Sequence, residues 1–433
     1  MEKSDAPVLI LGQGRSGQAA QNLLETEGTP TVIFSEEENS FADLEKFLSK
    51  TSPPFCVVSP GFSIHHPWVK SIACKGIPLR SELELGASRH LGKIIAVTGS
   101  NGKSTAVKWI FEALSLAGKK AAIGGNYGIP ACEVVCKEPD LEWLVLEVSS
   151  FQLEIVHDFS PNVAILLNLL PNHLDRHGTM EAYLETKWRI FGTPSNPVST
   201  AIFPQKYSAR PISARRSFCF GASSESDFYF KEGHIFWNSD KVVDLSETLF
   251  DSPIIGPCTG AACVAAAKAC EIPFSVMEKA AKNFNPLPHR LEKLGKIAGV
   301  TYVNDSKATN MAALSTAVQS IHTPIHLIAG GRAKESDYTF IKEVLEERVG
   351  RIYLVGEVSK ALNQAWSGVC SCSECKTLEA AFFAAQSAAQ PGDTVLLSPG
   401  CASFDQFRGF EERGELFRSL FCSAREKEKG TIF

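Results

Sequence analysis

Short apolar runs alternate with longer stretches of helical spacing along most of the chain. This alternation predicts parallel β-sheets with helices packed on their faces. The strand-like runs are residues 8–11, 31–34, 56–58, 94–97, 121–123, 144–150, 163–170, 300–303, 325–329, 351–355 and 394–397. Between about 194 and 252 the pattern changes to short β-like runs, and residues 228–237 with a Glu-Gly turn predict a hairpin.

The predicted fold is α/β with three domains. A chain of 433 residues is too long for one typical hydrophobic core. We expect a Rossmann-like N-terminal domain at 1–92, a central domain with a P-loop ATPase-type parallel sheet at 93–287, and a Rossmann-like C-terminal domain at 288–433. The last boundary follows a proline-marked segment at 284–288.

Composition and charge exclude some classes of partner. The chain is 44% hydrophobic and 21% charged, with a formal net charge of −5. This balance gives no electrostatic footprint for nucleic acid or an anionic membrane, and no apolar stretch is long enough to insert into a membrane. We expect a monomeric protein without a signal peptide and without a nucleic-acid partner.

The thirteen cysteines are an odd number and lie scattered from Cys56 to Cys422. Such a distribution indicates reduced thiols in the cytoplasm rather than a disulfide framework. One cluster, Cys370, Cys372 and Cys375, suggests zinc, but it lies between two helical patterns. It lacks a fourth ligand at the usual distance, so zinc is the less favoured interpretation.

A candidate phosphate loop, Thr-Gly-Ser-Asn-Gly-Lys-Ser-Thr at 98–105, follows an apolar run and leads into a helical pattern. Backbone N–H groups at the start of a helix bind phosphates. The loop is shorter than the full motif, because Val97 stands where the first glycine belongs. A chance Gly-Lys-Ser in a surface turn is the alternative. The expected ATP ligands are Gly99, Ser100, Asn101, Gly102, Lys103, Ser104 and Thr105, with Lys103 on the β/γ-phosphates and a hydroxyl of Ser104 or Thr105 on Mg²⁺.

Three further residues extend this candidate site. Glu147 interrupts an apolar strand, where a carboxylate is costly unless a lysine pairs with it or a metal such as Mg²⁺ binds it. His173 follows the run at 163–170 in a polar cluster, at the end of the strand where α/β sheets bind ligands. Lys187 has core spacing on a predicted helix, so it points either inward or, as most lysines do, toward solvent.

The N-terminal region has a Gly-x-Gly-x-x-Gly turn at 12–17 between a strand and a helix, which is typical of Rossmann-like units. Glu36 follows the next strand at the position that usually contacts a ribose. The turn alone is a weak signal, since NAD is one of several ligands and tight packing explains the glycines equally well. A Ser-Pro-Gly turn at 59–61 ends another strand at the same edge.

Polar clusters also follow three strands predicted in the last domain, at 304–310, 330–334 and 398–403. Loops at the carboxyl ends of parallel strands commonly form binding sites. Three α/β domains with one phosphate loop in the middle suggest a ligase that joins its substrates after a phosphorylation.

These motifs together resemble the Mur ligases. The matching segments, in family order, are 98–105, 124–126, 147–154, 173–177, 288–290, 304–310 and 398–407. The segments Ser-Ser-Phe-Gln-Leu-Glu and Cys-Ala-Ser-Phe-Asp point to the branch that adds D-glutamate to UDP-N-acetylmuramoyl-L-alanine in cytoplasmic peptidoglycan precursor synthesis. The resemblance implies that ATP phosphorylates the substrate carboxylate and that the D-glutamate amine then attacks the acyl phosphate, a reaction that needs positioning and charge neutralisation.

The resemblance also implies a role for each matching residue. Lys103, Glu147, His173 and Lys187 would be catalytic, and two Mg²⁺ ions would be held by Ser104, Glu147, His173 and a carbamylated Lys187. The nucleotide would also contact Arg290, Asp305 and Lys307, and the acyl-phosphate end of the substrate Asn126, Ser149 and Gln152. D-Glutamate would contact Lys307, Thr309, Lys334, Ser403, Phe404 and Phe410. UDP, rather than NAD, would contact Gly14, Arg15, Ser16, Ser35, Glu36, Ser59 and Gly61.

The chain departs from the family pattern at three places. A His-Asn-x-x-Asn pattern normally contacts adenine, but residues 258–262 are Cys-Thr-Gly-Ala-Ala, which predicts weaker or altered recognition of the base. Asn172 and Ala333 replace acidic residues, each one position before a site residue. Neither change removes a predicted metal or phosphate ligand, so we expect activity.

Three other interpretations compete with this one. A related ligase, such as a folylpolyglutamate synthase or the enzyme that adds the third peptide residue, would share the phosphate loop. A non-catalytic nucleotide-binding module would fit the altered segment at 258–262, but it would need neither Glu147 nor Lys187. A NAD-dependent oxidoreductase would leave the central phosphate loop unexplained.

Overall fold

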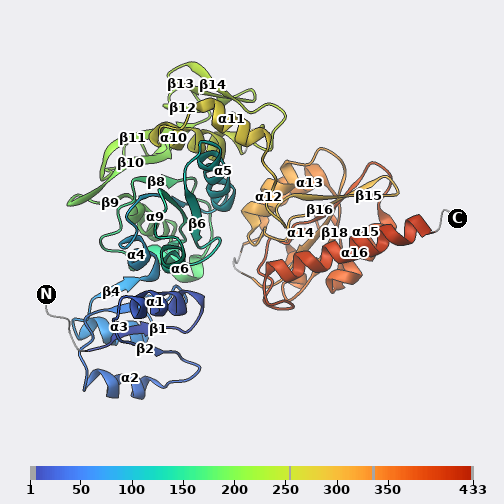
Figure 1. Cartoon of the computed structure of the whole chain (residues 1–433). Helices are drawn as coiled ribbons and strands as arrows, with labels where there is room; N and C mark the ends of the chain where they lie inside the picture. The colour runs from blue at the N-terminus through green and yellow to red at the C-terminus, as the bar shows by residue number, and fades with distance from the viewer. Residues whose placement is uncertain (1–5, 253–254, 334–336, 431–433) are drawn as a thin grey trace. The chain divides into compact units, whose positions relative to one another are not determined.

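Three β-sheets with helices packed against them confirm the expected α/β class (Figure 1). The computed structural model describes residues 6–252, 255–333 and 337–430. By its internal contacts this described chain forms two units: residues up to 169 with 179–284, and residues 170–178 with 285 onward. The first unit holds two of the sheets and the second unit holds the third. Domain boundaries at 92 and 287 remain predictions.

The first sheet is parallel, with the strand order β2-β1-β3-β4. Its elements are β1 (Val8–Leu11), α1 (Arg15–Thr26), β2 (Thr31–Phe34), α2 (Phe41–Leu48), β3 (Cys56–Val58), α3 (Pro67–Cys74), β4 (Leu79–Ser81) and α4 (Glu82–Ala87). Every residue of β1 is buried, because α1 covers one face of the sheet and α2 with α3 covers the other. The glycine turn follows the carboxyl end of β1 and so lies between the ends of β2 and β3.

The central sheet has ten strands, with the main order β14-β13-β12-β11-β10-β8-β5-β7-β6 and with β9 paired to β10. The strands are β5 (Lys93–Thr98), β6 (Ala121–Gly125), β7 (Trp143–Glu147), β8 (Val163–Leu166), β9 (Gly192–Thr193), β10 (Asn196–Pro204), β11 (Ala214–Gly221), β12 (Phe228–Lys231), β13 (His234–Trp237) and β14 (Asp240–Asp244). The predicted hairpin at 228–237 is confirmed as the antiparallel pair β12 and β13. The strand predicted at 163–170 is shorter, since β8 ends at Leu166.

Helices cover both faces of the parallel part of the central sheet, and each face has its own hydrophobic core. The helices around the central sheet are α5 (Lys103–Leu116), α6 (Ala131–Lys137), α7 (Ser150–Leu153), α9 (Met180–Trp188), α10 (Ala261–Ala269) and α11 (Phe274–Lys282). Trp109 of α5 stacks on Phe250, with ring centroids 3.9 Å apart. Strands that are buried on both sides read as continuous apolar runs, which is why the sequence predicted them well.

Two buried carboxylates on α4 join the first sheet to the central one. Glu82 accepts a hydrogen bond from the backbone N–H of Cys132 at 2.7 Å, in the first turn of α6. Burial raises the pKa of Glu82 to about 7. Glu84 accepts from the backbone N–H groups of His157 and Asp158. The connection between the two sheets is thus a hydrogen-bonded joint rather than a loose linker.

The third sheet has the order β15-β16-β20-β17-β18-β19 and is parallel except for β15. Its strands are β15 (Glu292–Ile297), β16 (Val300–Asn304), β17 (Ile325–Gly330), β18 (Val349–Val355), β19 (Ser371–Lys376) and β20 (Thr394–Leu397). Figure 1 shows its helices in two groups: α12 (Met311–Gln319), α13 (Lys342–Arg348) and α14 (Ser359–Trp366) cover one face, and α15 (Leu378–Ala388) and α16 (Phe410–Gly430) cover the other. The strand β15 was not predicted from the sequence.

The cysteine cluster lies at the edge of this sheet. Cys372 and Cys375 belong to the edge strand β19, and all thirteen cysteines of the chain are free thiols. Within the described residues, no group of three or more histidine, cysteine or acidic side chains is arranged to hold a metal ion. Two of the three cysteines of the cluster are therefore residues of the edge strand, and Cys370 directly precedes it.

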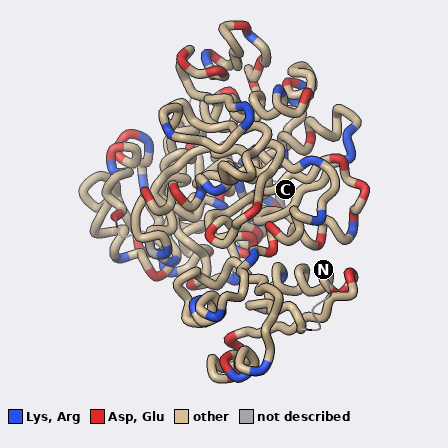
Figure 2. Tube along the Cα trace, turned by 90° about the vertical axis from the view of Figure 1, so that its left-hand side faces the viewer, with Lys and Arg blue, Asp and Glu red and all other residues tan. Residues whose placement is uncertain are grey.

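The described helices include none that is long and apolar enough to cross a membrane. Figure 2 shows lysines and arginines interspersed with acidic residues along the chain trace. This distribution agrees with the small net charge of −5.

Candidate active site

The phosphate loop joins the carboxyl end of β5 to the start of α5. Gly99 has a φ of +152° and Gly102 a φ of +82°, conformations that favour glycine. A Cβ on Gly102 would lie 2.8 Å from Oγ1 of Thr259. Both glycines are thus required by the backbone, and the loop ends at the N-terminus of α5, the end of a helix that favours an anion.

Lys103 lies within the curve of this loop. Its Nζ donates to the carbonyl oxygens of Gly99 and Ser100, each at 2.9 Å. Ser104 and Thr105, in the first turn of α5, are buried. The structure thus brings a cation, a helix N-terminus and two hydroxyl residues to one edge of the central sheet. The interpretation of a chance turn is not supported.

Glu147 ends β7, the strand paired directly beside β5. Its side chain is buried, and Oε1 accepts a hydrogen bond from Nδ2 of Asn126 at 2.7 Å. Oε2 is also buried but has no hydrogen-bond partner. An uncompensated carboxylate oxygen is costly, and a hard divalent cation is the ligand that would satisfy it. Glu147 therefore fits the expected Mg²⁺ role. The alternative was a lysine partner, but no ion pair of Glu147 is seen among the described residues.

Lys187 points inward from α9. Only 1% of the residue is exposed, and Nζ donates to Oγ1 of Thr98 at 3.2 Å and to the carbonyl of Gly99 at 3.1 Å. Burial, together with the nearby charge of Lys103, lowers the pKa of Lys187 well below its usual value, while Glu147 opposes the shift. Lys187 therefore places a buried amine, with a reduced tendency to hold its proton, beside the phosphate loop.

The two substrate candidates Ser149 and Gln152 form the cap of α7. Oγ of Ser149 accepts from the Gln152 backbone N–H at 3.2 Å, and the Ser149 N–H donates to Oε1 of Gln152 at 2.9 Å. His173 precedes the short helix α8 (Leu174–His177) with a left-handed φ of 56°. His173 belongs to the second unit, whereas Lys103, Glu147 and Lys187 belong to the first.

The glycine turn of the first sheet is tightly packed. A Cβ on Gly17 would lie 1.9 Å from the carbonyl oxygen of Gly12, and one on Gly12 would lie 2.9 Å from Oγ of Ser59. Gly14 and Gly61 have open space around the missing Cβ. Ser35 is buried and its Oγ has no hydrogen-bond partner. The expected nucleotide residues therefore do gather at one edge, with Ser16 in the first turn of α1 and Glu36 just after β2.

In the second unit, Asp305 is a buried carboxylate at the carboxyl end of β16. It accepts from Oγ of Ser398 at 2.9 Å and from the Leu291 backbone N–H at 3.1 Å. Burial raises the pKa of Asp305 to about 7, although these hydrogen bonds and the charges of Arg290 and Arg413 oppose the shift. The loop after β16 and the loop after β20 are thereby linked through one side chain.

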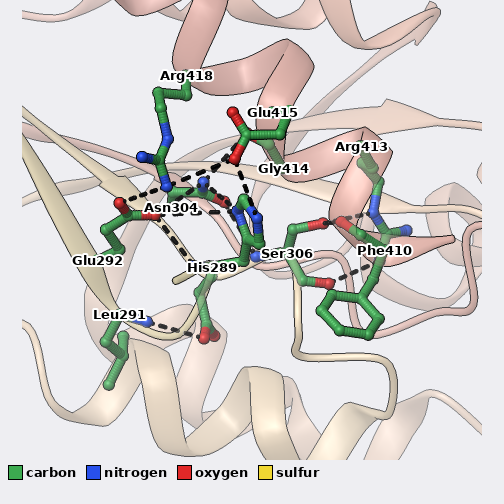
Figure 3. Close-up of polar contacts among 11 residues, drawn as sticks. His289, Leu291, Glu292, Asn304, Ser306, Phe410, Arg413, Gly414, Glu415 and Arg418 are labelled. Atoms are coloured by element: carbon green, nitrogen blue, oxygen red, sulfur yellow. Dashed lines mark hydrogen bonds and ion pairs between the residues drawn. The ribbon is translucent and has the colours of Figure 1, made fainter. Parts of the chain in front are cut away.

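The guanidinium of Arg413 strengthens that link (Figure 3). It donates to Oγ of Ser306 at 3.0 Å and to the carbonyl of Cys401 at 3.2 Å. Lys307 lies with Nζ 3.9 Å from the ring centroid of Phe410. A buried cation on α16 therefore fixes the backbone on both sides of the predicted amino-acid ligands.

Figure 3 also shows His289 pointing toward Asn304 and Glu415. Its Nδ1 is 3.0 Å from Nδ2 of Asn304, and its Nε2 is 3.4 Å from a carboxylate oxygen of Glu415. Of the remaining predicted residues, Ser403 is buried and Phe404 is exposed. Thr309 lies in the loop before α12, and Lys334 lies outside the described residues.

Comparison with known protein families identifies the family of this chain. Residues 97–269 match the model of the Mur ligase middle domain, and residues 289–401 match that of the Mur ligase glutamate ligase domain. The chain belongs to the Mur ligase family. It is 33% identical to the UDP-N-acetylmuramoylalanine–D-glutamate ligase of Acidobacterium capsulatum, over 98% of each chain. It is 35% identical to the ligase of the same name from Pelotomaculum thermopropionicum, over 97% of this chain and 98% of the relative.

Solved structures of Mur ligases share the fold. The Thermotoga maritima UDP-N-acetylmuramate-alanine ligase aligns over 97% of this chain and 100% of its own, with a TM-score of 0.60 and 12% identity. The Thermotoga maritima MurF ligase, solved in complex with ADP, aligns over 89% of this chain and 92% of its own, with a TM-score of 0.59 and 16% identity. These likenesses confirm the three-domain α/β class that the sequence predicted.

The position where this Mur ligase departs from the family pattern adopts an unusual local structure. Residues Gly256–Gly260 form a π-helical turn that leads into α10, and Cys258 lies within it. Oγ1 of Thr259 is the atom that a side chain on Gly102 would meet. The altered segment is thus packed against the phosphate loop.

Asn168, which the sequence pattern did not single out, holds the phosphate loop. Its Oδ1 accepts from the Asn101 backbone N–H at 2.9 Å, its Nδ2 donates to the Asn101 carbonyl at 3.1 Å, and its own carbonyl accepts from the Ser100 N–H at 3.1 Å. The side chain thus holds the phosphate loop as a neighbouring strand would. In the sequence, the only sign of this role is that Asn168 interrupts the apolar run at 163–170.

Replacing this amide should weaken nucleotide binding. In Asn168→Ala the peptide of Asn101 loses two hydrogen bonds, and we expect affinity for ATP, measured by calorimetric titration, to fall about tenfold. The matched control is Asn162→Ala at the other end of β8, where Oδ1 accepts from the Ile94 N–H at 2.7 Å. That variant should lose stability but keep its ATP affinity. Equal ATP affinity in Asn168→Ala and the wild type would contradict the assignment.

Proposed function

We propose that this Mur ligase joins D-glutamate to UDP-N-acetylmuramoyl-L-alanine, with ATP converted to ADP and phosphate. The observation that carries the proposal is the buried, unsatisfied Oε2 of Glu147 beside the phosphate loop and Lys187. A nucleotide-binding module has no need of such a carboxylate. Two relatives are named as this ligase, and each shares about one third of its residues with this chain over nearly the full length.

The phosphate loop would hold ATP for transfer of the γ-phosphoryl group to the carboxylate of the L-alanine residue. The N–H groups at the start of α5 and the ammonium of Lys103 would neutralise the charge that this transfer spreads over the phosphate oxygens. Ser104 and Glu147 would hold one Mg²⁺, which supplies further charge neutralisation. Asn126 donates to Glu147 and so fixes the carboxylate that faces the metal.

Lys187 would act as a carbamate. Its neutral amine adds to the carbon of CO₂ and loses one proton, which converts a buried cation into an anion. His173 and this carbamate would hold the second Mg²⁺. Support comes from the burial of Lys187 and from the lowered pKa of its amine, because only the unprotonated form reacts with CO₂.

The remaining residues would position the three substrates. Arg290, Asp305 and Lys307 would contact the nucleotide, and Asn126, Ser149 and Gln152 would contact the acyl-phosphate end of the substrate. D-Glutamate would be held by Lys307, Thr309, Lys334, Ser403, Phe404 and Phe410, and UDP by Gly14, Arg15, Ser16, Ser35, Glu36, Ser59 and Gly61. The amine of D-glutamate attacks the carbonyl carbon of the acyl phosphate. Phosphate leaves, and the amide bond forms. We further propose a cytoplasmic monomer with domain boundaries near 92 and 287.

Phosphate release from ATP tests this function. With UDP-N-acetylmuramoyl-L-alanine present, we expect release that depends on D-glutamate and is absent with L-glutamate, L-lysine or no amino acid. Release that depends on another amino acid would assign the protein to a Mur ligase with a different amino-acid substrate. No release with any of them would favour a non-catalytic nucleotide-binding module.

Removal of the Lys187 side chain tests the carbamate. We expect Lys187→Ala to lose at least about a hundredfold in kcat, as removal of a group that stabilises transition-state charge commonly does. Added formate should partly restore the rate, because a small carboxylate can occupy the space of the lost anion. Lys108→Ala, on the phosphate-loop helix but partly exposed, is the control and should keep wild-type activity. A wild-type rate in Lys187→Ala would overturn the assignment.

A further inference from the structure

One arginine contacts the outer face of α9, the helix that carries Lys187. Arg210 lies in the segment that follows β10, and its Nη1 is 3.2 Å from Oε1 of Glu181. Its Nη2 donates to Oε1 of Glu185, and Cζ of its guanidinium lies 5.0 Å from the ring centroid of Trp188. The three contacted residues stand at positions i, i+4 and i+7, so they lie along one side of the helix.

The opposite side of α9 faces the phosphate loop. Oγ of Ser100 donates to the hydroxyl of Tyr183 at 3.3 Å, and Nζ of Lys187 donates to Oγ1 of Thr98 at 3.2 Å. The helix therefore lies between the phosphate loop on one side and Arg210 on the other.

Trp188, the residue next to Lys187, joins the same segment to the helix a second time. Its indole Nε1 donates to the carbonyl oxygen of Pro211 at 3.0 Å, and the ring of Tyr207 packs edge-on against it, with centroids 5.8 Å apart. A helix of nine residues is too short to be stable alone, so its position depends on such tertiary contacts.

Arg210 differs from an isolated ion pair on the surface, which contributes little to stability. Its side chain is only 24% exposed, and its planar guanidinium serves two carboxylates and one aromatic ring at once. Because the guanidinium is rigid, these contacts fix α9 relative to the segment after β10.

The position of α9 decides where the end of the Lys187 side chain lies. This residue is buried, and close-packed surroundings leave little room to correct a shift of the helix. The proposed carbamate must reach the predicted Mg²⁺ site beside the phosphate loop. Misplacement of a catalytic group by about 1 Å can lower a rate roughly a hundredfold. The contacts on the outer face of α9 therefore affect the chemistry at its inner face.

We propose that Arg210 is a positioning residue that holds α9, and with it the carbamate of Lys187, against the phosphate loop. The inference rests on the proposed function and deepens it, because it names a residue outside the site that sets how readily Lys187 is carbamylated. Among the described residues, Arg210 contacts none that is assigned to a substrate or to a metal ion.

The test compares the bicarbonate dependence of full-length Arg210→Ala with that of the wild type, in buffer depleted of CO₂. We expect the bicarbonate concentration for half-maximal kcat to rise about tenfold, while the KM values for ATP and for UDP-N-acetylmuramoyl-L-alanine stay unchanged. With ¹³C-labelled bicarbonate and no substrates, the NMR signal of the carbamate carbon should weaken in the same variant. This second measurement does not depend on activity.

Arg216→Ala is the matched control. Arg216 lies on β11 and also places its guanidinium over an aromatic ring, with Cζ 5.2 Å from the centroid of Phe218, and it donates to Oγ1 of Thr200 at 3.1 Å. This variant loses similar contacts on another element, so it should keep the bicarbonate dependence of the wild type. Arg210→Lys, which keeps the charge but loses the planar fork, should give a value between those of Arg210→Ala and the wild type.

A double variant separates positioning from a general loss of structure. In Lys187→Ala with added formate, the anion is no longer attached to α9, so the further change Arg210→Ala should leave the formate-supported rate unchanged. A further loss of that rate would refute the positioning role.

The inference also fails if Arg210→Ala keeps the bicarbonate dependence and the carbamate signal of the wild type, or if Arg216→Ala changes them equally. A wild type with neither a carbamate signal nor a bicarbonate dependence would instead refute the proposed carbamate, on which the inference rests.

Discussion

The phosphate-loop site is shaped by one electrostatic constraint: two ionisable side chains, Glu147 and Lys187, are buried around the same loop. Neither is paired directly with the other. Glu147 keeps one oxygen without a partner, and the amine of Lys187 is held by Thr98 and the Gly99 carbonyl. Burying such groups costs several kcal/mol unless a ligand or a modification compensates them.

The loops around this constraint are held by polar side chains from neighbouring strands. Asn168 fixes the Asn101 peptide, and Asn126 fixes the carboxylate of Glu147. In the second unit Arg413 does the same by donating to the carbonyl oxygens of Ser306 and Cys401. Preorganisation of this kind matters for phosphoryl transfer, in which the protein contributes positions and charges rather than a nucleophile.

The sequence predicted most strands, since buried parallel strands are continuous apolar runs, and it predicted the phosphate loop from its glycines. It left Lys187 open because helical spacing identifies a face but not how deeply that face is buried. The run at 163–170 was predicted too long, because Asn168 leaves the strand to bind Asn101. The strands β15 and β19 are rich in lysine, serine and glutamate, so they carry little β signal. Contacts between residues far apart in sequence, such as Arg210 with Glu185, have no local signature at all.

An acyl-phosphate route through the site at Glu147 can be followed with ¹⁸O. The measurement uses UDP-N-acetylmuramoyl-L-alanine labelled in the carboxylate of its L-alanine residue. We expect one labelled oxygen to leave in the released phosphate, because the carboxylate oxygen that accepts the γ-phosphoryl group departs with it. Unlabelled phosphate, or label found in AMP, would exclude this route and show that the carboxylate is activated in another way.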